Sequence, residues 1–86
     1  MRQHRLYYHD ACLYCIHVLG ELNKLDTVVE LRNILRNSNY RHQLRQGGGK
    51  QQVPCLQTIT CDGQEEWLYE SSAIIERLQH IAKPAV

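Results

Sequence analysis

The 86-residue sequence predicts a single α/β domain, residues 1–86, with the element order β-α-β-α-β-β-α. Three observations support this prediction. Runs of β-forming residues alternate with segments of helical spacing, turn residues separate them, and a late Asp-Gly pair is typical of a β-hairpin. A strand–helix–strand unit places its strands in parallel, whereas a hairpin adds antiparallel strands. We therefore expect a four-stranded mixed sheet flanked by three helices.

The first half of the chain is expected to contain a strand at 5–9, a helix from Cys12 to Leu25 and a strand at 28–34. The first strand carries Leu and Tyr, which favour β-structure. Apolar residues in the helix recur every three or four positions, which gives it a broad buried face. Polar and apolar residues alternate through 28–34, as they do in half-buried strands.

The middle of the chain is expected to form a helix from 38 to 46. Asn37 begins a run of residue types that cap helix N-termini. The three glycines at 47–49 are expected to supply a C-cap and a flexible loop.

The last third is expected to form strands at 53–60 and 65–70, joined by the Asp-Gly turn at 61–64. A final helix is predicted over 71–82, with Ser71 or Ser72 as its N-cap. Pro84 marks its end.

Composition and charge argue against several classes of function. The net charge is +1 and the sequence pI is near 7.7, so a strongly basic nucleic-acid-binding surface is not expected. Basic residues between Arg32 and Arg45 are mixed with Asn, Gln and Ser, as on a solvated helix face or a binding patch for an anionic tripeptide or a partner protein. Neither a signal peptide nor an apolar run long enough to cross a membrane is visible, so we expect a cytoplasmic protein. We also expect it to be a monomer.

Cys12 and Cys15 form a Cys-x-x-Cys pair, which is compatible with a metal site, a redox centre or two ordinary thiols at a helix start. A structural zinc site needs four ligands, usually as two close pairs. The other thiols, Cys55 and Cys61, stand at opposite ends of a predicted strand, roughly 20 Å apart. We therefore expect no metal, and interpret Cys55 as a small buried residue and Cys61 as a turn thiol.

The position of the pair favours redox chemistry. Cys12 lies where the first strand passes into the first helix, and unpaired N–H groups together with the helix dipole favour a thiolate there. Cys15 follows one turn later on the buried side, from which it can attack a mixed disulfide formed at Cys12. The pattern predicts Cys12 as the nucleophile and Cys15 as the resolving thiol.

Pro54 stands at the start of a strand that is predicted to lie inside the sheet, where proline is normally excluded. A cis Val53–Pro54 bond would explain this position and would turn the Val53 N–H and C=O towards the cysteine pair. The alternative is that Pro54 merely begins an edge strand.

Three motifs in order, LYYHDACLYC, GGKQQVP and YESSAIIERL, resemble the thioredoxin superfamily, and most closely glutaredoxins and the N-terminal domain of glutathione S-transferases. The cysteine pair is similar to the glutaredoxin Cys-Pro-Tyr-Cys site. Residues 70–74 are similar to the Glu-Ser-x-Ala-Ile signature of the transferases. The resemblance covers essentially the whole chain and implies a thioredoxin-like fold.

The resemblance also implies a groove for glutathione, with Cys12 forming a mixed disulfide with the glutathione thiol. Val53 would pair through its backbone with the cysteinyl unit, as an added strand does. Glu70, Ser71 and the N–H groups of the last helix would hold the γ-glutamyl end, although helix capping is a simpler role for Ser71. Lys50 would meet the glycyl carboxylate, or would simply be a solvated loop lysine. The full set of implied glutathione-binding residues is Tyr14, Lys50, Val53, Pro54, Glu70 and Ser71.

The sequence departs from the glutaredoxin pattern at three places. Leu13 replaces the usual proline, and Glu70-Ser71 replaces an Asp-Asp pair. His9 stands where many glutaredoxins carry lysine, and it supports a thiolate only when protonated, while Asp10 opposes it. We therefore expect Cys12 to ionise less readily than in relatives with basic flanks.

These observations predict a glutaredoxin-type, glutathione-dependent thiol–disulfide oxidoreductase. Its partners would be glutathione and disulfide-containing or glutathionylated proteins. The resemblance to the transferases covers only their N-terminal domain; we expect no all-helical second domain, and therefore no conjugation of hydrophobic electrophiles. Two alternatives stay open: a [2Fe–2S] cluster held between two protomers by Cys12 and glutathione, which the bulk of Leu13 disfavours, and a non-catalytic glutathione-binding module.

Overall fold

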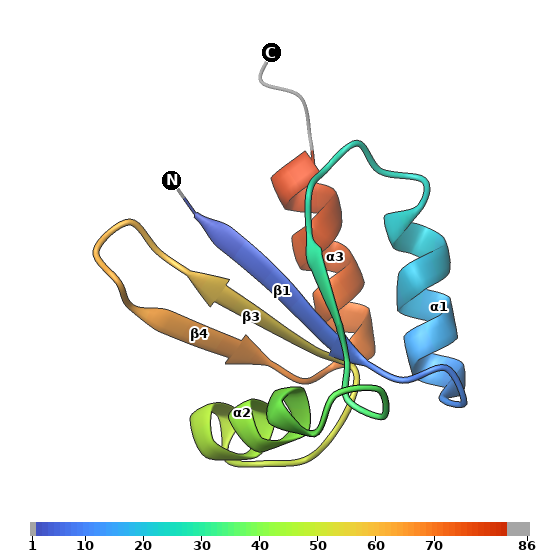
Figure 1. Cartoon of the computed structure of the whole chain (residues 1–86). Helices are drawn as coiled ribbons and strands as arrows, with labels where there is room; N and C mark the ends of the chain where they lie inside the picture. Colours follow the sequence, from blue (N-terminus) through green and yellow to red (C-terminus); the bar gives the residue numbers. More distant parts are fainter. Residues whose placement is uncertain (1, 83–86) are drawn as a thin grey trace.

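The computed structural model describes residues 2–82 and confirms the predicted order of elements (Figure 1). The strands are β1 (Gln3–Tyr8), β2 (Glu30–Asn33), β3 (Cys55–Ile59) and β4 (Glu65–Leu68). The helices are α1 (Leu13–Leu22), α2 (Ser38–Gly48) and α3 (Ser71–Ala82). Pro84, predicted to follow the last helix, lies outside the described residues.

The strands form one mixed sheet in the order β2-β1-β3-β4, as predicted. β1 pairs in parallel with β2, and β3 is antiparallel to both β1 and β4. The parallel pair requires the crossover through α1, whereas the β3–β4 pair is the predicted Asp-Gly hairpin, in which Gly63 has a φ of +86°.

Helices cover both faces of the sheet: α1 and α3 lie on one face and α2 on the other (Figure 1). Successive strand residues point to opposite faces. Leu6 therefore packs with Val18 and Ile74 below α1 and α3, whereas Tyr7 packs with Leu44 of α2. In the range 2–82 no helix has the length and apolar character needed to cross a membrane.

Strand boundaries differ from the predictions because sheet pairing, not side-chain type, sets them. β1 starts at polar Gln3, which pairs with Ile59, and ends before His9. β2 covers only 30–33, the residues that pair with β1. The alternating pattern in 28–34 therefore overestimates the length of this strand. β3 and β4 are likewise limited to the paired residues and omit both Val53-Pro54 and Tyr69-Glu70.

Helix α1 is shorter than the predicted span from Cys12 to Leu25. Cys12 is its N-cap, with extended dihedrals, and Asn23 is its C-cap. The N–H groups of Lys24 and Leu25 bond to carbonyls three residues back, which tightens and ends the helix.

Helix α2 begins as predicted but continues through two of the three glycines. Asn37 is the N-cap and its side chain accepts the Asn39 N–H at 2.9 Å. Gly47 and Gly48 are helical, and only Gly49, with a φ of +87°, has the left-handed conformation of a C-cap. The prediction of a flexible loop at 47–49 is therefore wrong for its first two residues.

Helix α3 has the predicted bounds, Ser71–Ala82, but a different cap. Ser71 is its first residue, and the Glu70 carbonyl accepts the Ile74 N–H at 2.8 Å. Glu70 therefore occupies the cap position that we predicted for Ser71 or Ser72.

Candidate functional site

Cys12 lies at the junction between β1 and α1. As N-cap of α1 it has φ −103° and ψ 121°, and its sulfur accepts the Cys15 N–H at 3.3 Å. The side chain is half-buried. A backbone N–H directed at the sulfur, in the first turn of a helix, can stabilise negative charge that develops on it.

Cys15 is completely buried under the first turn of α1. Burial raises the pKa of its thiol to about 12, and hydrogen bonding to Cys12 adds to this effect. Cys15 is therefore a neutral thiol at neutral pH. Of the two sulfurs, Cys12 is the one that solvent and a ligand can reach.

Val53 and Pro54 stand against this junction from the segment between α2 and β3. The Val53–Pro54 peptide bond is cis, which confirms the prediction. The Cys12 thiol donates to the Val53 carbonyl oxygen at 3.9 Å. The cysteine pair and the residue before the cis-proline, which are 41 positions apart in sequence, are thus neighbours in space.

A groove of about 280 Å³ opens beside these residues. It includes five of the six residues predicted to bind glutathione and two others. Its lining residues are Tyr14, Gln52, Val53, Pro54, Tyr69, Glu70 and Ser71. The start of α1, the segment before β3 and the start of α3 therefore form one surface.

The Glu70–Ser71 end of the groove is the N-terminus of α3. The first N–H groups of a helix have no acceptor within it and carry partial positive charge. Glu70 is exposed and Ser71 is half-buried beside these groups. This end therefore offers a carboxylate together with hydrogen-bond donors, which suits a ligand that bears both an ammonium and a carboxylate.

Lys50 is the predicted site residue that does not line the groove. Its ammonium lies 5.6 Å from the centroid of the Tyr69 ring. Its backbone is held by the same side chain: the Tyr69 hydroxyl accepts the Lys50 N–H at 3.3 Å and donates to the Lys50 carbonyl at 3.1 Å. The structure thus gives Lys50 a contact with the groove only through Tyr69.

Tyr69 and Gln52 are lining residues that sequence reasoning missed. Both lie inside the motifs quoted above, next to Glu70-Ser71 and Val53-Pro54, but neither was assigned a role in the site. Tyr69 joins the β4–α3 connection to the segment after α2 through its two bonds to Lys50. It thereby ties two walls of the groove together.

His9 and Asp10 both have partners outside the groove. The His9 Nδ1 atom accepts the Ala11 N–H at 3.2 Å, and the Asp10 carboxylate accepts from the Asn33 amide at 3.2 Å. These contacts shape the turn between β1 and α1. No cluster of three or more His, Cys, Asp or Glu side chains able to hold a metal occurs within residues 2–82.

The family model for the N-terminal domain of glutathione S-transferases matches residues 6–85. No curated protein sequence matches the chain.

Solved structures with a similar fold include a mutant of a thioredoxin-like protein, with a TM-score of 0.66 and 18% sequence identity. This match covers 94% of the present chain and 100% of the thioredoxin-like protein. Maleylacetoacetate isomerase from Anaeromyxobacter dehalogenans, crystallised with glutathione in its active site, has a TM-score of 0.57 and 24% identity. That match covers 98% of this chain and 40% of the isomerase, so the chain spans about two fifths of the isomerase's length. The same isomerase was also crystallised with dicarboxyethyl glutathione and citrate.

The sheet order and the similar structures agree with the family match. The chain has a thioredoxin-like fold and belongs to the family of glutathione S-transferase N-terminal domains.

Proposed function

We propose that this protein is a glutathione-dependent thiol–disulfide oxidoreductase in which Cys12 is the nucleophile. The observation that carries the proposal is the position of the Cys12 sulfur: it accepts an N–H of the first helical turn and lies 3.9 Å from the Val53 carbonyl, which belongs to the groove wall. A half-buried thiol at a helix start is the usual setting of a reactive cysteine. Glutathione in the similar isomerase structure supports the choice of co-substrate.

Glutathione would lie extended in the groove. Its cysteinyl unit would pair with the backbone of Val53, and Tyr14 and Pro54 would border it. Glu70 would accept from the γ-glutamyl ammonium, while Ser71 and the α3 N–H groups would receive the α-carboxylate. Lys50 would need to leave the Tyr69 ring to reach the glycyl carboxylate.

The reaction exchanges thiols for disulfides in two steps. The Cys12 thiolate attacks the glutathione sulfur of a protein–glutathione mixed disulfide, which releases the protein thiolate and leaves Cys12 bonded to glutathione. A second glutathione thiolate then attacks that bond, which yields oxidised glutathione and restores the Cys12 thiolate. The proteins acted on would be disulfide-containing or glutathionylated, in a reducing compartment such as the cytoplasm.

Titration of the reduced protein with glutathione, followed by amide chemical shifts, tests the proposed binding site. The largest shifts are expected at Cys12, Val53 and Ser71, because these residues come from the three walls of the groove. Shifts that cluster on the far side of the sheet would place the ligand elsewhere and refute the groove.

Tyr69→Phe is expected to weaken glutathione binding by about 3- to 10-fold in the same titration. The substitution keeps the ring but removes both bonds to Lys50, each worth about 0.5–1.5 kcal/mol, so the wall that carries Gln52 and Val53 is no longer fixed. Tyr40→Phe is the matched control, since the Tyr40 hydroxyl forms no hydrogen bond within residues 2–82. Equal glutathione affinity in wild type and Tyr69→Phe would mean that the two Tyr69–Lys50 hydrogen bonds are not needed for binding.

Cys15→Ser is expected to leave the reduction of a glutathione mixed disulfide within about twofold of wild type and to abolish the reduction of protein disulfides through a dithiol route. Burial raises the pKa of the Cys15 thiol to about 12, so Cys15 is almost entirely a neutral thiol at pH 7. Glutathione is therefore expected to attack the Cys12–glutathione disulfide before Cys15 does. For the same reason the Cys15-dependent rate in wild type should rise as the pH increases from 7 to 9.

Cys15→Ala provides the folding control, because it removes the thiol without burying a hydroxyl. Both variants should behave alike in the glutathione assay. A large loss of mixed-disulfide reduction in both would show that Cys15 takes part in every turnover, against the proposed monothiol route.

A further inference from the structure

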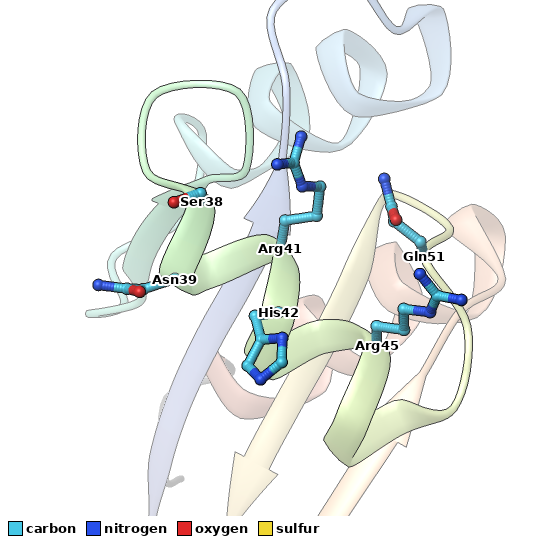
Figure 2. A pocket seen from close by; sticks show the side chains of 6 residues that line it. All are labelled: Ser38, Asn39, Arg41, His42, Arg45 and Gln51. Atoms are coloured by element: carbon cyan, nitrogen blue, oxygen red, sulfur yellow. The ribbon is translucent and has the colours of Figure 1, made fainter.

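A second hollow, of about 330 Å³, lies along the outer side of α2 (Figure 2). It is lined by Ser38, Asn39, Arg41, His42, Arg45 and Gln51. Two of these side chains are guanidinium groups and a third is an imidazole, whereas none is a carboxylate. In Figure 2 the Arg41 and Arg45 side chains project from α2 on the same side, as expected for residues four positions apart on a helix.

The charges in this hollow are uncompensated. Neither the Arg41 nor the Arg45 side chain forms an ion pair or hydrogen bond with any residue between 2 and 82. Arg32, by contrast, is paired with Glu30, and Arg77 with Glu66. The chain as a whole carries only +1, so the positive charge of α2 is a local feature of its surface.

The hollow adjoins the proposed glutathione groove. Gln51 lines the first and Gln52, the next residue, lines the second. Glutathione presents a single carboxylate at its glycyl end, and one guanidinium is enough to pair with it. Arg41 and Arg45 together therefore offer more positive charge than the glycyl carboxylate requires.

We propose that this hollow docks carboxylates of the protein substrate, so that the preferred substrates are glutathionylated proteins with Asp or Glu side chains close to the modified cysteine. The proposal rests on the proposed oxidoreductase function. Exposed charge pairs are weak one by one, but several like charges at the rim of a binding site raise association rates and make them salt-dependent. The basic hollow next to the groove thus selects protein partners and takes no part in the chemical step.

Two glutathionylated peptides that differ only in Glu or Gln residues beside the cysteine test this preference. We expect kcat/KM to be about 3- to 10-fold higher for the Glu peptide at about 20 mM salt, and the ratio to fall below about twofold at 0.5 M, where the screening length is only a few ångströms. In Arg41→Gln/Arg45→Gln the ratio should be near one at both salt concentrations. The double variant Lys24→Gln/Arg77→Gln changes the net charge equally and should keep the wild-type ratio.

Two results would overturn the inference. One is an equal kcat/KM of the wild type for both peptides. The other is an equal loss for both peptides in Arg41→Gln/Arg45→Gln, accompanied by a raised KM for glutathione, which would assign the hollow to glutathione itself. Thermal unfolding of the variant excludes a folding defect.

Failure of the proposed function would look different, because neither peptide would then be turned over by any variant. In that case, titration of the protein with each peptide still tests whether the hollow binds acidic side chains. Amide shifts of Arg41 and His42 that are larger with the Glu peptide than with the Gln peptide support the hollow as an acid-binding surface, and equal shifts refute it.

Discussion

Cys12→Ser is expected to lower glutathione-dependent reduction of a glutathionylated peptide by more than about 100-fold, to the rate of uncatalysed exchange with glutathione. A serine hydroxyl has almost no anionic form at neutral pH, so it cannot attack a disulfide sulfur. Cys15 cannot replace it, because that thiol is buried with a pKa of about 12. The measurement is oxidised glutathione formation, followed through its reduction by glutathione reductase.

Cys61→Ser is the matched control for Cys12→Ser. Cys61 is exposed in the turn between β3 and β4, at the far end of β3 from the groove, so its replacement should leave turnover unchanged. The Cys12→Ser protein should still bind glutathione, because the groove walls are intact. Retained turnover in Cys12→Ser would make the assignment of the nucleophile wrong. Binding without turnover in the wild type would instead identify a non-catalytic glutathione-binding module.

Local signals in the sequence were sufficient to predict the element order and the neighbours of Cys12. Each strand or helix that packs on a core has one apolar face. The spacing of apolar residues along the sequence shows that face directly. The cis Val53–Pro54 bond was predicted because proline conflicts with an interior strand, and that conflict is visible without coordinates. Tyr14, Glu70 and Ser71 were located by motif, and the structure places them on one groove.

Features that depend on tertiary contacts were missed. Tyr69 was assigned to a strand, yet its hydroxyl spans 19 positions of sequence to hold the Lys50 backbone. Lys50 was expected either to meet the glycyl carboxylate or to be a solvated loop lysine, and neither expectation included the position of its ammonium over the Tyr69 ring. Gly47 and Gly48 were assigned to a loop because a run of glycines is typical of a C-cap and a flexible connection. Both are helical, and both lie against the Trp67 and Tyr69 rings too closely to leave room for a Cβ.

Gly48→Ala is expected to destabilise the protein although alanine is the better helix former. A Cβ at this position would overlap the Tyr69 hydroxyl, lie 2.9 Å from Tyr69 Cζ and 3.2 Å from Trp67 Cε3. Neither ring can move away without losing contacts: Tyr69 is bonded to Lys50, and Trp67 lies against Tyr7 at 5.5 Å between centroids. Overpacking of this kind costs about 1–3 kcal/mol, against a gain of about 1 kcal/mol in helix propensity.

The net loss should appear as a lower melting temperature, by about 4–8 °C for each kcal/mol in a domain of this size. Because the methyl group displaces Tyr69, glutathione affinity should fall as well, which links this end of α2 to the groove. Gly20→Ala is the matched control in α1, where a Cβ meets nothing within 4 Å, and it should raise stability by about 0.4–1 kcal/mol. If both variants were stabilised alike, helix propensity alone would govern these positions. Opposite signs would instead demonstrate that the closeness of α2 to Tyr69 and Trp67 requires glycine, and that the glycine run serves packing rather than flexibility.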